Sequence, residues 1–138
     1  MAETEIGLVM LVDDNDTDNF IHKRVIELTG FCKNIIVKNS GKSALDYLET
    51  NKFNLDLLPN IIFLDINMPI VDGFVFLFEY ENFPDELKNK CKIVILSSSD
   101  SKRDIDRIVD NEFVINFITK PLSDEALTKL KKEFKAYL

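Results

Sequence analysis

Five short apolar runs recur along the chain, and a segment of helical character follows each one. The runs are Ile6–Val12, Ile35–Val37, Ile61–Leu64, Lys92–Leu96 and Val114–Ile118. Continuous apolar runs of this length, bounded by turn residues, are typical of strands that are buried on both faces. Strands that alternate with helices favour a parallel sheet with helices on both faces, joined by right-handed crossovers. We therefore predict an α/β fold, a (βα)5 three-layer sandwich.

The predicted helices begin near residues that cap helix N-termini, and they carry apolar residues at helical spacing. The predicted starts are Asp16–Asp18, Ser40 or Ser43, Gly73, Asp100 or Ser101, and Ser123. In the first helix, which ends at Thr29-Gly30, the predicted apolar face is Phe20, Ile21, Val25, Ile26 and Leu28. Five strand–helix pairs favour the flavodoxin-like strand order 2-1-3-4-5, whose switch point lies between strands one and three.

Length and charge restrict the class of protein. A chain of 138 residues predicts a single domain over 1–138, with a core of about 6–137. The net charge of -7 argues against binding to nucleic acid or to an anionic membrane surface. No apolar run approaches the ~18 residues of a membrane span, and the N-terminus lacks a signal-peptide pattern. Cys32 and Cys91 have no motif spacing, so we expect reduced thiols and a cytoplasmic protein.

Polar side chains follow four of the five predicted strands, at the point where each strand ends. Asp13 and Asp14 follow the first strand, Asp65 the third, Ser97 the fourth and Lys120 the fifth. Each residue alone has an ordinary explanation as a helix cap, a loop residue or a solvated charge. Together they meet at the carboxyl edge of one sheet, where open α/β sheets bind ligands. The sequence therefore predicts one polar site at this edge.

The chemistry of that site follows from its charges. Three carboxylates in one crevice repel one another, so they stay ionised together only if cations offset them. Lys120 supplies one positive charge, and a hard divalent ion such as Mg²⁺, which prefers oxygen ligands, is the natural second. With both cations present the site can accept further oxygen ligands, such as those of a phosphoryl group. A carboxylate there can attack phosphorus and form an acyl phosphate.

Four motifs in this order and spacing resemble the receiver domain of the response-regulator family of two-component signalling, in its stand-alone, CheY-like form. They are Asp13-Asp14, Asp65-x-x-Met68-Pro69-x-x-Asp72-Gly73, Ser97, and Lys120-Pro121. The resemblance covers the chain from Ile6 to about Tyr137. It implies a phosphoprotein of phosphorelay signal transduction, which is phosphorylated by a sensor histidine kinase or a histidine phosphotransfer protein.

The resemblance also implies a role for each matching residue. Asp65 would accept the phosphoryl group, and Ser97 and Lys120 would hold its oxygens. Asp14 and Asp65 would bind Mg²⁺ through carboxylates, Asn67 through its backbone carbonyl, and Asp13 mainly through water. The Lys120–Pro121 peptide bond is expected to be cis, which a tertiary amide allows at small cost.

The same resemblance implies a conformational switch. Phosphorylation would draw the Ser97 hydroxyl toward the phosphoryl group, and Phe117 would rotate inward at the face formed by the fourth helix, fifth strand and fifth helix. The sequence does not identify the downstream protein target, and it leaves open a monomer or a phosphorylation-dependent dimer. Asn67 and Ser99 occupy the two positions that tune phosphoryl lifetime, and neither predicts unusually fast self-hydrolysis.

Two other functions would use some of the same residues. A magnesium-dependent phosphatase with an aspartyl nucleophile typically has Asp-x-Asp after its first strand, whereas Asn67 stands two residues beyond Asp65 and cannot act as a general acid. A receiver that has lost phosphorylation would serve as a fixed scaffold, although here every acceptor and metal position is intact. We expect a binding module that does not turn over an external substrate.

Three features are particular to this chain. The segment Gly73–Glu81 is apolar nearly all round, and we expect the loop 82–90 to fold over Val75 and Phe78. The alternative is that these two side chains form an exposed patch for a partner. His22 is expected to face solvent. The last helix carries a basic stripe that is expected to be a solvated face, formed by Lys129, Lys131, Lys132 and Lys135.

Overall fold

The predicted fold is confirmed in a computed structural model, which describes residues 6–98, 102–108 and 110–135. Five parallel strands form one sheet in the order β2-β1-β3-β4-β5. They are β1 (Ile6–Val12), β2 (Cys32–Lys38), β3 (Ile61–Leu64), β4 (Lys92–Ser97) and β5 (Val114–Thr119). Ser99, the expected caps Asp100 and Ser101, and Tyr137 lie outside the described residues.

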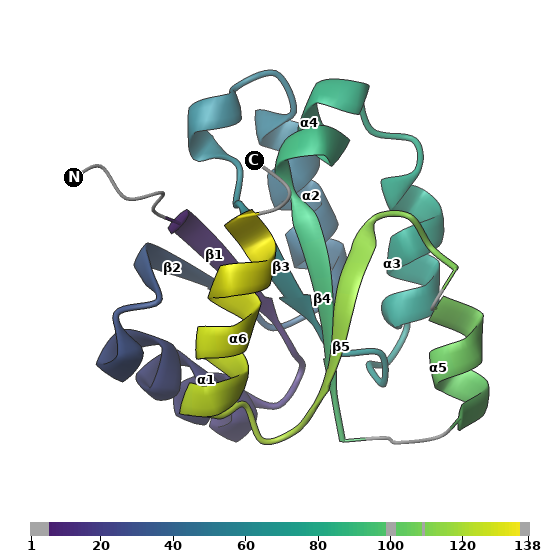
Figure 1. The fold of residues 1–138 in the computed structure, drawn as a ribbon. Coiled ribbons are helices and arrows are strands. Elements are labelled where there is room, and N and C mark those ends of the chain that lie inside the picture. The colour runs from purple at the N-terminus through teal and green to yellow at the C-terminus, as the bar shows by residue number, and fades with distance from the viewer. Residues whose placement is uncertain (1–5, 99–101, 109, 136–138) are drawn as a thin grey trace.

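Helices cover both faces of the sheet (Figure 1). They are α1 (Asp16–Thr29), α2 (Gly41–Asn51), α3 (Gly73–Tyr80), α4 (Asp85–Lys90), α5 (Lys102–Ile108) and α6 (Asp124–Phe134), with a short 3-10 turn, η1, at Leu55–Leu57. One core cluster joins the sheet to α1 and α6, and the other joins it to α2, α3, α4 and α5. The strands divide their side chains between the clusters. Met10 and Val12 belong to one, while Val9 and Leu11 belong to the other.

Polar caps and close approach set several helix ends. The Ser40 and Ser123 side chains accept hydrogen bonds from backbone N–H groups in α2 and α6, as predicted. At α1 the N-cap is Asn15 and not a residue of Asp16–Asp18, because the Asn15 side chain accepts from the N–H of Asp18. Gly73 begins α3 against Ile66, where a Cβ atom would lie 2.6 Å from the Ile66 side chain.

The apolar face predicted for α1 is right for Ile26, which is buried, and wrong for its most exposed members. The helix buries Asn19, His22 and Ile26, whereas Phe20 and Leu28 are 67% and 75% exposed. The expectation that His22 faces solvent is therefore also wrong. Asn19 and His22 face inward because Asn19 donates a hydrogen bond to the backbone of Asp13, which fixes the rotation of the first turn. Hydrophobic periodicity alone selects the more apolar face of a helix, and it gives no information about the hydrogen bond from Asn19 to Asp13.

The segment 82–90 does not cover Val75 and Phe78, which are 40% and 70% exposed. It forms the short helix α4, which sequence reasoning treated as a loop. Its own apolar residues, Phe83 and Leu87, are buried and leave no side chain of that kind to extend over α3. Phe83 packs edge-on against Tyr80, with ring centroids 6.0 Å apart. The expected loop cover is therefore wrong, and the outer side of α3 is an exposed apolar patch.

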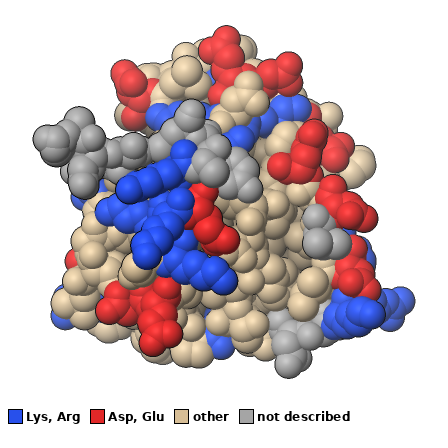
Figure 2. All heavy atoms as spheres, viewed as in Figure 1, with Lys and Arg blue, Asp and Glu red and all other residues tan. Residues whose placement is uncertain are grey.

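The basic stripe of the last helix is visible on the surface. Figure 2 shows Lys and Arg side chains gathered over α6, with acidic side chains beside them. Lys129, Lys132 and Lys135 are exposed, and Lys131 is partly buried. Among the helices of the described residues, none is both long enough and apolar enough to cross a membrane.

Ile70, in the loop between β3 and α3, has a strained backbone. Its φ angle is +67°, and it is 97% exposed. The N–H of Val71 donates to the carbonyl of Pro69 at 2.7 Å, which closes a tight turn around Ile70. A β-branched residue in this left-handed region clashes with its own backbone, and it gains no packing here in return.

We predict that Ile70→Gly stabilises the protein. Relief of the left-handed conformation is worth about 1–2 kcal/mol, and the extra freedom of glycine in the unfolded chain offsets roughly half of that. The free energy of unfolding, measured by urea denaturation, should rise by about 0.5–1 kcal/mol. Ile70→Ala, which keeps the Cβ atom, is the matched control and should change it much less. A loss of stability in Ile70→Gly would contradict the strain.

His22 predicts a pH dependence of stability. Burial, followed by the charge of Lys120, lowers the pKa of His22 below its ordinary value of 6.5. Above pH 6.5 both folded and unfolded states are neutral at this residue. As the pH falls below 6.5 the unfolded state takes up the proton first, so the stability contributed by neutral His22 is lost toward the lower, folded pKa.

The test compares the native protein with His22→Gln, which cannot titrate. The difference in free energy of unfolding between the two should shrink as the pH is lowered from 7 to 5, a window chosen around the ordinary pKa of 6.5. Subtracting the two curves removes the contribution of every other titrating group. A difference that stays constant over this window would contradict the burial of a neutral imidazole.

Candidate phosphoryl and metal site

The parallel register brings the polar strand ends to one edge of the sheet. Val12 pairs with Leu64, and the N–H of Asp65 donates to the carbonyl of Val12 at 3.0 Å, so β1 and β3 end side by side. On the other side, Ser97 pairs with Thr119, and the N–H of Lys120 donates to the carbonyl of Ser97 at 2.8 Å. The predicted convergence of the strand ends is therefore a consequence of backbone pairing.

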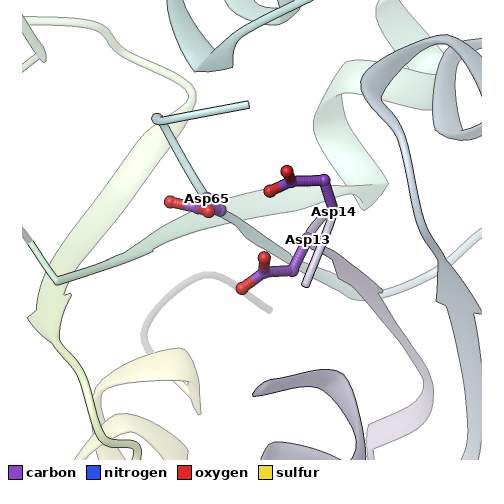
Figure 3. A group of neighbouring side chains, drawn as sticks. All are labelled: Asp13, Asp14 and Asp65. Carbon is purple, nitrogen blue, oxygen red and sulfur yellow. The ribbon is translucent and has the colours of Figure 1, made fainter. Parts of the chain in front are cut away.

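Three carboxylates meet at this edge (Figure 3). Asp13, Asp14 and Asp65 each offer an oxygen, and these oxygens all lie within 4.8 Å of one another. Asp13 and Asp65 are buried, at 4% and 5% exposure, while Asp14 is exposed. Carboxylate oxygens are the ligands that hard divalent cations prefer, and the exposed Asp14 leaves one side open to water. This donor set fits a hard divalent cation.

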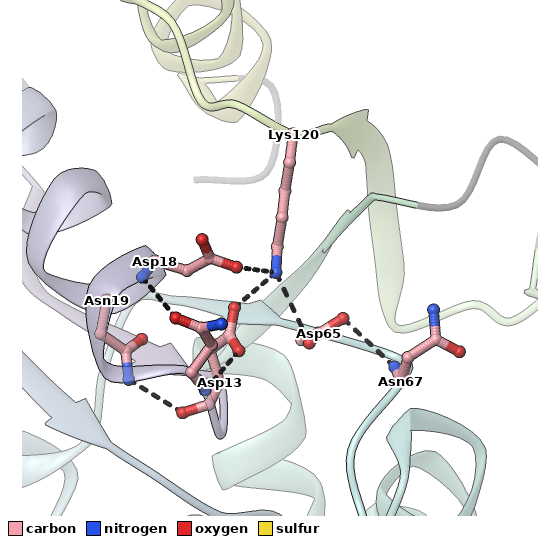
Figure 4. Close-up of polar contacts among 7 residues, drawn as sticks. Asp13, Asp18, Asn19, Asp65, Asn67 and Lys120 are labelled. Atoms are coloured by element: carbon pink, nitrogen blue, oxygen red, sulfur yellow. Dashed lines mark hydrogen bonds and ion pairs between the residues drawn. The ribbon is translucent and has the colours of Figure 1, made fainter.

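Lys120 reaches into the same group from the end of β5 (Figure 4). Its Nζ donates hydrogen bonds to Asp13 Oδ2 at 2.6 Å and to Asp18 Oδ2 at 2.9 Å. The contact with Asp65 Oδ2 is a longer ion pair, at 3.5 Å. Burial by itself would lower the pKa of Lys120, but the hydrogen bonds to Asp13 and Asp18 and the neighbouring negative charges raise it above its ordinary value. The ammonium therefore stays charged.

Asp65 lies in a strongly perturbed environment. Burial first, and the charge of Asp13 second, raise the pKa of Asp65 from 3.8 to about 6. The N–H of Asn67, which donates to Asp65 Oδ1 at 3.2 Å, and the charge of Lys120 offset only part of this. The ionised carboxylate is thus short of positive charge, which is the condition under which a carboxylate gains from binding a cation.

Backbone and side-chain hydrogen bonds hold Asp13 in place. Asp13 Oδ1 accepts from the N–H of Asn15 at 2.9 Å, and its backbone carbonyl accepts from Asn19 Nδ2 at 2.8 Å. Sequence reasoning missed Asn19 in this role, and it missed Asp18 as a partner of Lys120. An acid at the start of a helix most often caps it, so the sequence pattern around Asp18 predicts capping and gives no signal of a second role.

The remaining predicted site residues lie at the same edge or beneath it. Ser97 is fully buried at the end of β4, and Asn67 is exposed in the loop after Asp65. The Lys120–Pro121 bond is cis, as predicted. Phe117 is partly buried on β5 and lines a cavity of about 250 Å³ between β5 and α5, together with Ile105, Ile108, Val114, Ile115 and Asn116.

Comparison with known proteins finds matches over most of the chain. Residues 9–132 match the family model of the response regulator receiver domain. The probable methanogenesis regulatory protein FilR2 of Methanothrix harundinacea is 33% identical over 130 residues, covering 94% of this chain and 82% of that protein.

Solved structures show the same likeness. A two component response regulator from Cytophaga hutchinsonii has a TM-score of 0.88 and 30% identity, covering 96% of this chain and 99% of that one. The Mn²⁺-bound form of response regulator Rcp1 has a TM-score of 0.71 and 25% identity, covering 94% and 92%. The chain therefore belongs to the response regulator receiver domain family of two-component, phosphorelay signalling.

Proposed function

We propose that this protein is a single-domain response regulator in which Asp65 accepts a phosphoryl group from a phosphohistidine, with Mg²⁺ as cofactor. The observation that carries the proposal is the environment of Asp65. Its buried carboxylate lies with two other carboxylates within 4.8 Å, and an ammonium lies 3.5 Å away. The donor would be a sensor histidine kinase or a histidine phosphotransfer protein.

Asp14 and Asp65, with the backbone carbonyl of Asn67 and with Asp13 acting mainly through water, would hold the metal ion. Bound there, Mg²⁺ would neutralise charge on phosphoryl oxygens. The solved Rcp1 structure is described as a Mn²⁺-bound form, which supports a divalent ion in this family. The choice of Mg²⁺ rests on the all-oxygen donor set.

The protein's own residues supply the remaining chemistry. A carboxylate oxygen of Asp65 forms a bond to phosphorus while the bond from phosphorus to the histidine nitrogen breaks, and the histidine leaves with the electron pair. Lys120 and Ser97 then hold phosphoryl oxygens as negative charge shifts onto them. The protein is its own substrate. Asn67, in the position where an aspartyl phosphatase has its general acid, supports a receiver over a turnover enzyme.

The output is a conformational switch at the face formed by α5, β5 and α6. Ser97 moves toward the phosphoryl group, and Phe117 turns inward. Phe117 already lines a cavity of about 250 Å³ beside α5, so the ring has space next to it. A downstream protein binds the altered face. The receiver presents this face either as a monomer or as a dimer that forms on phosphorylation.

The first test is covalent. Incubation with acetyl phosphate and Mg²⁺ should add one phosphoryl group to the intact protein, detected by mass spectrometry. Asp65→Asn should abolish the adduct, because an amide is not a nucleophile toward phosphorus, and a chelator should suppress it. Asp16→Asn, which removes an exposed carboxylate from the start of α1, should leave it unchanged.

Two outcomes contradict the proposal. Steady turnover of a phosphomonoester without a stable adduct would indicate a phosphatase. The absence of any adduct from the native protein would indicate a receiver that acts only as a scaffold.

The second test uses stability. The folded pKa of Asp65, about 6, exceeds its ordinary value of 3.8, so ionised Asp65 destabilises the fold above pH 6 and acidification relieves this. Asp65→Asn should therefore raise the free energy of unfolding at pH 7 in metal-free buffer. The gain should be on the order of 1 kcal/mol, after discounting for screening by solvent.

Added Mg²⁺ should stabilise the native protein, because a ligand that binds only the folded state shifts unfolding by mass action. The difference in free energy of unfolding between Asp65→Asn and the native protein should therefore become smaller. Thermal unfolding with and without the metal measures both effects. A destabilised Asp65→Asn in metal-free buffer would contradict the electrostatic account of the site.

A further inference from the structure

Asp18 is the unexpected member of the polar network. It comes from the first turn of α1, and its side chain is 34% exposed. Its backbone N–H donates to Asn15 Oδ1 at 3.0 Å, so the N-cap of the helix fixes its position. From there its carboxylate accepts a hydrogen bond from Lys120 at 2.9 Å. Figure 4 shows Asp18 reaching Lys120 from the side of α1.

Lys120 has three N–H donors and three carboxylates around it. Hydrogen bonds engage Asp13 and Asp18, at 2.6 and 2.9 Å, while Asp65 is left at 3.5 Å. Of these three carboxylates, Asp13 and Asp65 belong to the group that can hold a metal ion, and Asp18 does not. Asp18 thus takes a donor of Lys120 without contributing to the metal site.

A phosphoryl group on Asp65 changes this balance. It adds negative charge and strong acceptor oxygens beside an ammonium that is already hydrogen-bonded elsewhere. Asp13 is held by hydrogen bonds from Asn15 and Asn19, and it would also contribute to the proposed metal site. Loss of its contact with Lys120 would therefore disturb more of the site. The partly exposed Asp18 can be solvated when it is released, so its bond to Lys120 is the one that can be exchanged at least cost.

We propose that Asp18 is a positioning residue that competes with the phosphoryl group for Lys120. In the unphosphorylated protein Asp18 holds the ammonium toward α1. On phosphorylation the ammonium transfers its hydrogen bond from Asp18 to a phosphoryl oxygen, and the Asp18 carboxylate turns to solvent. No covalent bond changes in this exchange. The inference rests on the proposed function of Asp65, and it adds a residue that sets how readily the phosphorylated state forms.

The experiment measures the affinity for beryllofluoride, a mimic of a phosphoryl group on a carboxylate, by calorimetry in the presence of Mg²⁺. Asp18→Asn should bind it about fivefold more tightly than the native protein, since one partly exposed ion pair no longer competes. A residue that merely supported Lys120 structurally would give the opposite result, because its loss would weaken binding.

The matched control is Asp16→Asn, in the same helical turn. Asp16 is exposed, and its removal subtracts the same formal charge, so it measures the long-range electrostatic effect alone. A second control repeats both substitutions in Lys120→Ala. In that background Asp18→Asn should bind no better than Asp16→Asn, because the competition requires the ammonium. Thermal unfolding of each variant confirms that it is folded.

The outcomes distinguish failure of the competition by Asp18 from failure of the proposed function. The competition is overturned if Asp18→Asn binds beryllofluoride no more tightly than Asp16→Asn, or if its gain in affinity persists in Lys120→Ala. The proposed function still stands in either case, provided that the native protein binds beryllofluoride. A native protein that binds no beryllofluoride overturns the proposed function, and the role of Asp18 falls with it.

Discussion

The contact of one ammonium with several carboxylates is the interaction on which the carboxyl edge of this protein depends. Asp13 and Asp65 are both buried, and like charges that close destabilise one another. Lys120 follows the edge strand β5 and supplies the compensating charge. Its ion pairs connect the ends of β1, β3 and β5 with the start of α1. The compensation is incomplete, because the pKa of Asp65 is still raised. That shortfall of positive charge is what suits the site to a metal ion.

The sheet makes this arrangement possible. The central strands β1, β3 and β4 are buried over most of their length, and any slip in their register would expose apolar side chains or leave backbone groups unpaired. Their ends are therefore held to the precision of the backbone hydrogen bonds, such as those from Asp65 to Val12 and from Lys120 to Ser97. The rigid core positions charges that would otherwise separate, and stability stored in the core offsets the cost of crowding them.

Sequence reasoning succeeded where one physical requirement dominates a segment. The five strands, their order, the caps at Ser40 and Ser123, and the strand-end residues were all predictable, because apolar runs and polar caps leave local signals. It failed where two requirements compete. The stripe through Phe20 and Leu28 looked like the buried face of α1, but a polar anchor at Asn19 turns the helix so that His22 is buried instead.

Strand periodicity, chain direction and strand order together decide where each strand end lies, so the fold class and the set of groups that meet at the sheet edge could be predicted from the sequence alone. How those groups share their charges could not be predicted in this way, because it depends on side-chain contacts between distant parts of the folded chain. The bond between Lys120 and Asp18 joins residues 102 positions apart, and it depends on the rotation of α1 and the reach of one side chain. Neither the rotation of α1 nor the reach of the Lys120 side chain can be recognised from the local sequence pattern. The exposure of the outer side of α3 also depends on tertiary packing, because Phe83 and Leu87 are buried in the core and do not cover it.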